Sequence, residues 1–235
     1  MPDPVIKVVI PALNEQGAIG KVIAEIPTWI NQIIVVDNGS TDNTAKVART
    51  AGARVISVPI PGYGRACLAG IAACQPCDIV VFLDGDASDY PEDMPELLQP
   101  ILQGDADLVI GSRRRGDIEK GALTLPQRFG NALACWLMAK IWGGKFTDLG
   151  PFRAIRMDAL AALNMSAPTF GWTVEMQVRA LKQGLKCAEI PVRYKNRIGK
   201  SKISGTVSGV ILAGGYILGT IAREAFSGSG AKYEG

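Results

Sequence analysis

Short apolar runs alternate with segments of helical periodicity through the first half of the chain, and this alternation limits the possible folds more than any other feature. Five runs are expected to be strands: Val5–Ile10, Gln32–Val36, Arg54–Val58, Asp78–Leu83 and Leu108–Ile110. The segments between them are expected to be helices: Ala18–Ile26, Thr41–Ala51, an alanine-rich stretch ending near Ala73, and Pro91–Gln103. Strands that are apolar on both faces belong to parallel sheets covered by helices on both sides. The chain is therefore predicted to be an α/β protein with a mostly parallel sheet.

The second half of the chain is less regular. Its expected elements are the helices Pro126–Trp142, Thr169–Gln183 and Val207–Phe226 and one strand, Leu185–Val192. The residues from Ser227 onward are rich in glycine and serine, a composition that favours disorder. We predict an α/β domain over residues 1–205, a small C-terminal helical appendage over 206–226 and a disordered tail over 227–235.

Composition argues against several classes of protein. A net charge of +3 gives no reason to expect a nucleic-acid partner. The N-terminus has no signal pattern and no segment is apolar enough to be expected to span a membrane, which predicts a cytoplasmic protein. The five scattered cysteines are expected to be free thiols. Cys74 and Cys77 have the spacing of a redox or zinc pair, but they precede a strand and the chain has no histidine, so we interpret this spacing as structural or incidental.

Polar side chains follow three of the expected strands at the point where each ends. Asn14 and Glu15 follow the first strand, Asp37 follows the second, and Asp84 and Asp86 follow the fourth. Ligands bind in such sheets outside the carboxyl ends of the strands. The sequence therefore predicts one binding crevice at this edge.

The stretch VVFLDGDASDYP places three carboxylates within six positions, directly after the apolar run Val80–Leu83. Carboxylates this close repel one another and require a positive partner. For Asp84 and Asp86 we predict that the partner is Mg²⁺ or Mn²⁺, which bind carboxylate oxygens together with substrate phosphates. Gly85 between them would let a ligand approach the backbone closely. Asp89 is instead assigned to the helix that begins at Pro91.

The segment from Asp37 to Thr44 reads as a turn followed by a helix N-terminus. Ser40, Thr41 and Asp42 suit that structural role, but Asp37 is explained least by it. A carboxylate at a strand end could accept hydrogen bonds from a base or a ribose. The chain lacks a G-x-G-x-x-G motif after a strand and a Walker A motif, which argues against dinucleotide-binding and P-loop proteins.

An ordered set of motifs resembles the inverting family 2 glycosyltransferases with the GT-A fold, and among them the polyprenyl-phosphate sugar synthases of the dolichyl-phosphate mannose synthase kind. The first motifs are PALNE from Pro11, VVDNGSTDNT from Val35, GYGRA from Gly62 and FLDGDASD from Phe82. The later ones are GSRRRG from Gly111, FGN from Phe129, FRAIR from Phe152 and RIGKSK from Arg197. The resemblance extends over roughly residues 5 to 205 and implies a GT-A nucleotide-diphospho-sugar transferase.

The resemblance also implies roles at matching positions. The nucleotide-sugar site would comprise Pro11, Asn14, Glu15, Asp37, Gly64, Arg65, Asp84, Gly85, Arg113, Arg197, Ser201 and Lys202. Within it, Asp37 would meet the base, and Arg197, Ser201 and Lys202 would lie in a loop that closes over the diphosphate. Asp84 and Asp86 would be the metal ligands, with Asp86 as the catalytic one. The donor would be a UDP-sugar or a GDP-sugar.

The general base is left open between two carboxylates, Asp148 and Glu175. A hydroxyl acceptor needs a proton acceptor, and the absence of histidine leaves carboxylates for this role. Glu175 could equally be an acid that favours the first turn of a helix. A phosphate acceptor is already an anion and would need no base.

The acceptor is predicted from basic and apolar segments. Two basic runs, Arg113–Arg115 and Arg193–Lys202, could hold a donor diphosphate and a lipid phosphate. The apolar segments Leu133–Trp142 and Ile203–Ala222 could contact a membrane surface, although a core helix is the alternative for the first. We predict a polyprenyl phosphate acceptor at the cytoplasmic face of a membrane. Two alternative functions are kept open: transfer to a soluble hydroxyl acceptor, and a non-catalytic nucleotide-sugar binder. The formation of a homo-oligomer is also left open.

Overall fold

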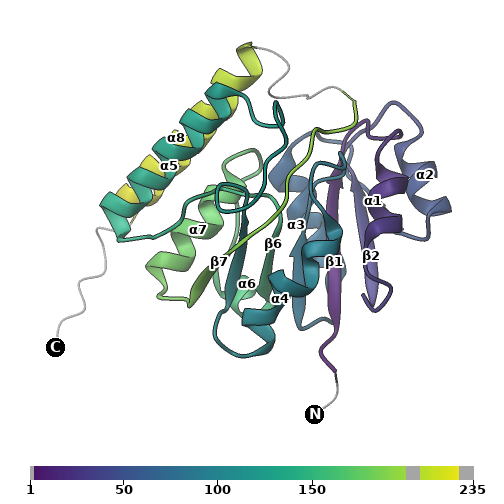
Figure 1. Cartoon of the computed structure of the whole chain (residues 1–235), viewed down its shortest axis with the longest axis horizontal. Coiled ribbons are helices and arrows are strands. Elements are labelled where there is room, and N and C mark those ends of the chain that lie inside the picture. The colour runs from purple at the N-terminus through teal and green to yellow at the C-terminus, as the bar shows by residue number, and fades with distance from the viewer. Residues whose placement is uncertain (1–2, 200–206, 228–235) are drawn as a thin grey trace.

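The centre of the fold is a seven-stranded sheet, seen in a computed structural model that describes residues 3–199 and 207–227 (Figure 1). The strand order is β3-β2-β1-β4-β6-β5-β7. The strands are β1 (Ile6–Ala12), β2 (Gln32–Asp37), β3 (Arg54–Ser57), β4 (Ile79–Phe82), β5 (Leu108–Ser112), β6 (Arg153–Arg156) and β7 (Cys187–Pro191). All neighbours pair in parallel except those of β6, which is antiparallel to both β4 and β5. The prediction of an α/β fold with a mostly parallel sheet is confirmed.

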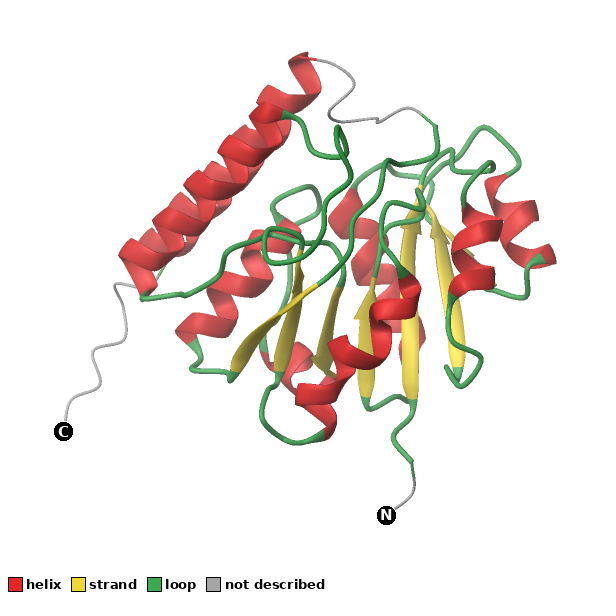
Figure 2. Cartoon of the chain, in the orientation of Figure 1, coloured by secondary structure: helices red, strands yellow, loops and turns green. Residues whose placement is uncertain are grey.

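Helices cover both faces of the sheet (Figure 2). They are α1 (Ile19–Glu25), α2 (Thr44–Thr50), α3 (Tyr63–Cys74), α4 (Met94–Leu102, after a 3₁₀ turn at Pro91–Asp93), α5 (Leu125–Trp142), α6 (Met157–Ala162), α7 (Trp172–Lys182) and α8 (Val207–Phe226). Val8 and Val81 pack toward α1 and α4, whereas Val9, Val80 and Phe82 pack toward α3 and α7. Because successive side chains point to opposite faces, both sides of these strands must be apolar.

Neither β6 nor α6 was predicted from the sequence. Phe152–Arg156 was interpreted as a motif, with no secondary structure assigned to it. The strand is short and has an arginine at each end, so its sequence pattern does not indicate that it is buried. Arg153 is fully buried because it donates hydrogen bonds to the carbonyls of Leu149 and Gly150 and to that of Thr173 in α7. This arginine therefore fixes the loop before β6 against α7.

Gly64 and Gly130 make a matched pair for measuring packing. A Cβ on Gly64 would lie 1.9 Å from the carbonyl oxygen of Ala167, whereas a Cβ on Gly130 in α5 would meet nothing within 4 Å. Gly64→Ala is expected to lower the free energy of unfolding by about 1–3 kcal/mol through overpacking. Gly130→Ala should raise it by about 0.5–1 kcal/mol, because glycine destabilises a helix interior. Urea denaturation measures both, and equal effects would contradict the packing at Gly64.

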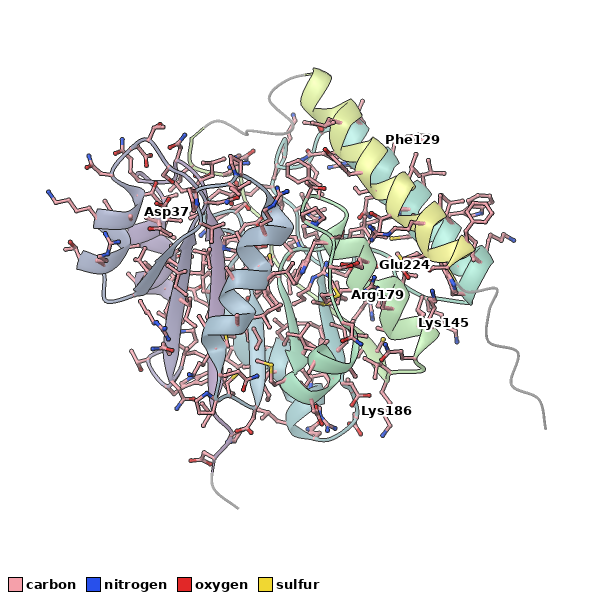
Figure 3. The ribbon with its side chains drawn as sticks, turned by 180° about the vertical axis from the view of Figure 1, so that it is seen from behind. Asp37, Phe129, Lys145, Arg179, Lys186 and Glu224 are labelled. Carbon is pink, nitrogen blue, oxygen red and sulfur yellow. The ribbon has the colours of Figure 1, made fainter. Side chains whose placement is uncertain are left out.

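Helices α5 and α8 lie side by side outside α7, away from the sheet (Figures 1 and 3). Helix α5 begins with a capping box at Thr124 and ends at Gly143, whose φ of 72° suits glycine. Its inner face carries Ala134 and Met138, which are buried. The opposite face carries exposed apolar side chains: Leu125, Phe129 and Trp136. The segment predicted to be either a core helix or an interfacial one thus has one buried face and one exposed apolar face, and its contact with a membrane stays a prediction.

In the described part of the chain, no helix combines the length and the apolar character needed to cross a membrane. All five cysteines are free, as predicted.

Candidate active site

The carboxyl ends of β1 and β2 are joined by hydrogen bonds between the turns that follow them. The Asn14 amide N–H donates to Ser40 Oγ at 2.9 Å, and Asn14 Oδ1 accepts from the Thr41 amide at 2.8 Å. Asp37 Oδ1 accepts from the Ser40 amide at 3.2 Å. The structure therefore brings Asn14 and Asp37 to one edge of the sheet, as the crevice requires. Figure 3 shows Asp37 across the molecule from Phe129 of α5.

The two carboxylates after β4 have separate partners. Asp84 Oδ1 accepts a hydrogen bond from the Tyr63 hydroxyl at 3.2 Å. Asp86 Oδ1 accepts from the amide and hydroxyl of Ser88 at 2.9 and 2.5 Å. Asp86 Oδ2 lies 3.1 Å from the Arg197 guanidinium, which also lies 3.0 Å from Glu15 Oε1. Among the described residues, Arg197 is thus a positive partner of this group, and it joins the basic loop to the ends of β1 and β4.

Asp89 belongs to this carboxylate group rather than to the following helix, so its assignment as a helix acid was wrong. It is 2% exposed and its Oδ2 accepts a hydrogen bond from the Asp84 amide at 3.2 Å. Its Oδ1 is buried without a hydrogen-bond partner among the described residues. The described start of the 3₁₀ turn and of α4 has no side-chain cap. The close spacing of three acids was the sequence signal for this group.

Burial, followed by repulsion from Asp86, raises the pKa of Asp84 from its usual 3.8 to about 7. The folded protein therefore holds a proton here that the unfolded chain releases near pH 4. This proton stabilises the folded state, so the free energy of unfolding contributed by Asp84 falls as the pH rises from about 4 to about 7. Asp84→Asn should weaken this pH dependence, as measured by urea unfolding between pH 4 and pH 8 in EDTA. Identical pH profiles for the two proteins would contradict the shift.

Asp148, one of the two candidate bases, is fully buried beside Arg113. The Arg113 side chain donates to it from Nε at 2.8 Å and from one terminal nitrogen at 2.6 Å, and the Arg113 amide donates at 2.8 Å. The guanidinium also lies 5.0 Å from the centre of the Tyr194 ring. Asp148 therefore positions Arg113.

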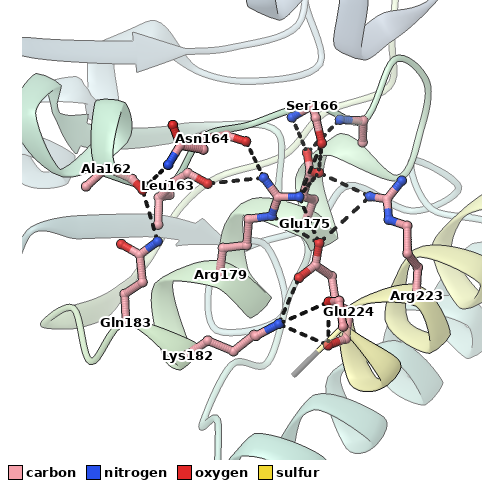
Figure 4. A network of polar contacts seen from close by, with 12 residues as sticks. Ala162, Leu163, Asn164, Ser166, Glu175, Arg179, Lys182, Gln183, Arg223 and Glu224 are labelled. Carbon is pink, nitrogen blue, oxygen red and sulfur yellow. Dashed lines mark hydrogen bonds and ion pairs between the residues drawn. The ribbon is translucent and has the colours of Figure 1, made fainter. Parts of the chain in front are cut away.

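Glu175, the other candidate base, is fully buried at the start of α7 (Figure 4). Its carboxylate accepts hydrogen bonds from the amides of Ser166 and Ala167 at 3.1 and 2.8 Å. It also forms ion pairs with Arg179 and Arg223 at 2.9 and 3.1 Å. The structure does not bring either candidate base to the cavity described below.

The other predicted residues lie as follows. Pro11 pairs with Val36 within the sheet, and Gly85 is buried near Ile10 and Ile19. Gly64 packs on the Ala167 carbonyl, and Arg65 is exposed and donates to the Pro61 carbonyl at 2.8 Å. Ser201 and Lys202 lie outside the described residues, so their placement stays a prediction.

A cavity of about 540 Å³ opens beside Asp84 and Asp86. Four arginines line it together with these two carboxylates: Arg113, Arg114 and Arg197 from the loops and Arg128 from α5. Its apolar end lies between α5, α8 and the loops beside them and includes Leu123, Pro126, Leu149, Phe170, Ala213 and Ile217. The sequence analysis had not singled out Tyr63, Arg128 and Tyr194, which also line it. Arg128 could have been noticed as a cation in the first turns of an apolar helix.

Comparisons with known proteins find similar sequences and similar solved structures. Residues 7–163 match the model of Glycosyl transferase family 2. An uncharacterized glycosyltransferase of Mycobacterium tuberculosis is 38% identical over 211 residues, 88% of this chain and 94% of the relative. A dolichyl-phosphate hexose transferase of Haloferax volcanii is 34% identical over 211 residues, 87% of this chain and 89% of the relative.

A similar solved structure is glucosyl-3-phosphoglycerate synthase from Mycobacterium tuberculosis in complex with Mn²⁺, UDP-glucose and phosphoglyceric acid. It is 27% identical, has a TM-score of 0.79, and the match covers 95% of this chain and 80% of that chain. The residues matched to the family model include the ends of β1, β2 and β4, where Asn14, Asp37, Asp84 and Asp86 lie.

Proposed function

This chain belongs to glycosyl transferase family 2, and we propose that it transfers a sugar, with inversion, from a nucleoside diphosphate to a polyprenyl phosphate. Its GT-A fold and its class, a glycosyltransferase, follow from the family and the similar structures. The proposal concerns the donor, the metal and the acceptor, each of which is argued from the site.

The donor would bind at the carboxyl ends of β1, β2 and β4. Its base would lie near Asp37 and its diphosphate near Asp86 and Arg197. The partnerless Oδ1 of Asp89, among the described residues, and the raised pKa of Asp84 both indicate an excess of negative charge at this point. A bound cation would relieve that excess.

The donor atoms of the site fit Mg²⁺ or Mn²⁺, both of which favour oxygen ligands. Asp84 and Asp86 would hold the ion. The described residues contain no group of three or more candidate ligands, so phosphate oxygens would complete the coordination. The metal would neutralise charge on the departing diphosphate. A UDP-glucose complex of the similar synthase contains Mn²⁺, which supports this choice.

The observation that carries the acceptor proposal is the composition of the cavity. Among the described residues that line it, the only carboxylates are Asp84 and Asp86, and both candidate bases lie elsewhere with other partners. A hydroxyl acceptor would need a base, whereas a phosphate is an anionic nucleophile. Arg113, Arg114 and Arg128 offer positive charge for that phosphate beside the apolar end. The same cavity could therefore bind both the phosphate and the apolar chain of a lipid phosphate.

The α5–α8 pair would place this cavity at the cytoplasmic face of a membrane. The exposed apolar side chains include Phe129 and Trp136 of α5 and Leu212 and Tyr216 of α8, at 70%, 54%, 54% and 41% exposure. Helices that lie in an interface carry such residues on one face with basic residues nearby. The polyprenyl chain would then enter the apolar end from the membrane.

A soluble phosphorylated acceptor is the second candidate, favoured by the phosphoglyceric acid bound to the similar synthase. The arginines of the cavity would suit that anion as well. Its apolar end, however, would gain nothing from a small polar acid. The two candidates therefore differ in whether the apolar wall contributes to binding.

The decisive experiment supplies radiolabelled UDP-sugars and GDP-sugars with Mn²⁺ to the whole chain. Undecaprenyl phosphate, dolichyl phosphate and 3-phosphoglycerate are offered in parallel, and organic-phase and aqueous products are counted. Label in the organic phase and co-sedimentation of the protein with liposomes are expected. Transfer confined to 3-phosphoglycerate, without binding to liposomes, would overturn the lipid acceptor.

A further inference from the structure

An ionic cluster joins α7 to the last turn of α8 (Figures 3 and 4). Its members are Glu175, Arg179 and Lys182 of α7 and Arg223 and Glu224 of α8. The two carboxylates are buried, Glu175 at 0% and Glu224 at 4% exposure. Removing one partner from a buried cluster leaves an uncompensated charge, which is strongly unfavourable. Such a cluster tolerates few relative positions of the elements it joins.

Glu224 fixes the end of α8. Its carboxylate accepts from Arg179 Nε at 3.0 Å and from Lys182 Nζ at 3.1 Å. Lys182 Nζ also donates to the Glu224 backbone carbonyl at 3.0 Å. Burial acts to raise the pKa of Glu224, but the hydrogen bonds from Arg179 and Lys182 hold it below its usual value. The side chain is thus charged and held by two cations of α7.

Glu175 extends the cluster toward the donor side of the protein. It holds the amides of Ser166 and Ala167, as described above. The carbonyl of Pro168, in the same segment, accepts a hydrogen bond from the Arg65 amide at 3.1 Å. Arg223 of α8 contacts Glu175 directly at 3.1 Å. The end of α8 and the first turn of α3 are therefore held against one segment, residues 166–168.

Helix α8 depends on such contacts for its position. It carries Gly214, Gly215 and Gly219, which each lower helix stability by about 1 kcal/mol relative to alanine. Among the α8 residues whose side chains are described, only Thr220, Ile221 and Glu224 are buried. The buried side chains described in this helix therefore lie near its C-terminal end.

The cavity wall lies at a distance from this anchor. Ala213, Gly214 and Ile217 of α8 line the cavity. The rise of a helix places Ala213 about 16 Å along the axis from Glu224, so a tilt of about 10° at the anchor moves it by about 3 Å. A small tilt of α8 at the cluster would therefore produce a larger displacement of the cavity wall.

We infer that the Glu175–Arg179–Lys182–Arg223–Glu224 cluster is a positioning device that seats α8 as a wall of the acceptor cavity. Its residues set the affinity for the acceptor without touching it. The inference rests on the proposed function for its kinetic consequence but not for its structural one, and the two are tested separately.

The kinetic test is Glu224→Gln, which keeps the shape of the side chain and removes its charge. The KM for the acceptor that the wild type uses is expected to rise about tenfold, equivalent to about 1.4 kcal/mol. Binding of UDP or GDP with Mn²⁺, and kcat at saturating acceptor, should change less than about twofold, since Glu224 itself contacts Arg179 and Lys182 of α7 and none of the residues proposed to hold the donor. The control, Glu92→Gln, removes an exposed partner of Arg193 and should leave all three quantities unchanged. Equal losses of donor and acceptor binding would overturn the inference.

The structural test needs no turnover. Amide hydrogen exchange of residues 212–227 is expected to rise at least about tenfold in Glu224→Gln while that of β1 and β4 stays unchanged. Glu224→Asp, which keeps the negative charge beside Arg179 and Lys182, should retain more of the protection than Glu224→Gln. Arg223→Gln, which removes a half-exposed cation, is a milder variant with a smaller effect in the same direction. Unchanged hydrogen exchange in α8 would disprove the positioning role of the cluster, whichever acceptor the enzyme uses. Raised exchange together with no transfer to a lipid phosphate would disprove only the lipid acceptor.

Discussion

Asp86→Ala is expected to reduce sugar transfer by about 10²–10³-fold, the loss typical of removing one group that stabilises charge in a transition state. Asp86 is the carboxylate that Arg197 contacts at 3.1 Å, and both would face the departing diphosphate. The substitution removes a proposed metal ligand and leaves Arg197 paired with Glu15 alone within this group. Transfer would be measured with a radiolabelled donor, with Mn²⁺ and with EDTA.

Binding and folding measurements separate this effect from unfolding. The thermal shift that UDP or GDP with Mn²⁺ produces in the wild type should be lost in Asp86→Ala, because a ligand stabilises only the state it binds. The circular dichroism spectrum should be retained. Asp105→Ala changes an exposed aspartate near the amino end of β5 and should keep full activity. Full activity of Asp86→Ala, or turnover that is independent of metal, would rule out the proposed donor site.

The features that could be predicted from the sequence are those encoded locally. Val80–Phe82 is apolar on both faces, so its burial in a parallel sheet was visible without any structure. Because the carboxyl ends of parallel strands meet at one edge, Asn14, Asp37 and Asp84 could be placed together from strand ends alone. Helix α8 was also predicted, since its apolar character outweighs its glycines.

The features that were missed depend on partners far along the chain. Arg153 is a charged residue at the start of a strand, and its burial is explained by carbonyl groups of the preceding loop and of α7. No local pattern shows that these carbonyls are available. Asp89 was assigned to the helix after it because the expected helix start, Pro91, is only two residues further on. Its contact with the Asp84 amide requires the loop to fold back on itself.

The two candidate bases show the same limit. Their sequence neighbourhoods are apolar, which is compatible with a catalytic carboxylate and with a structural one. Glu175 finds Arg223 48 positions away, and Asp148 finds Arg113 35 positions away. Sequence spacing does not indicate these pairs. A variant of Asp148 distinguishes the two roles most sharply, because they predict different measurable losses.

Asp148→Asn is expected to destabilise the protein rather than only to slow catalysis. Asn keeps the volume but removes the charge opposite Arg113, whose side chain is 13% exposed. Breaking a buried ion pair from one side costs about 3–5 kcal/mol. For a chain of this size, that lowers the melting temperature by about 6–20 °C. Asp158→Asn, at a pair whose aspartate is 66% exposed, should cost less than about 1 kcal/mol.

The relative losses of stability and of kcat in Asp148→Asn distinguish a residue that positions Arg113 from a catalytic base. If Asp148 positions Arg113, stability falls, and the KM for the phosphate acceptor rises because the Arg113 guanidinium is no longer held at the cavity. The residual kcat should then be independent of pH where a carboxylate would titrate. If Asp148 were the base, kcat would be lost even at saturating acceptor, whatever the change in melting temperature. The bidentate geometry, with both carboxylate oxygens occupied by one guanidinium, favours the first outcome, since a base needs a free lone pair directed at its proton.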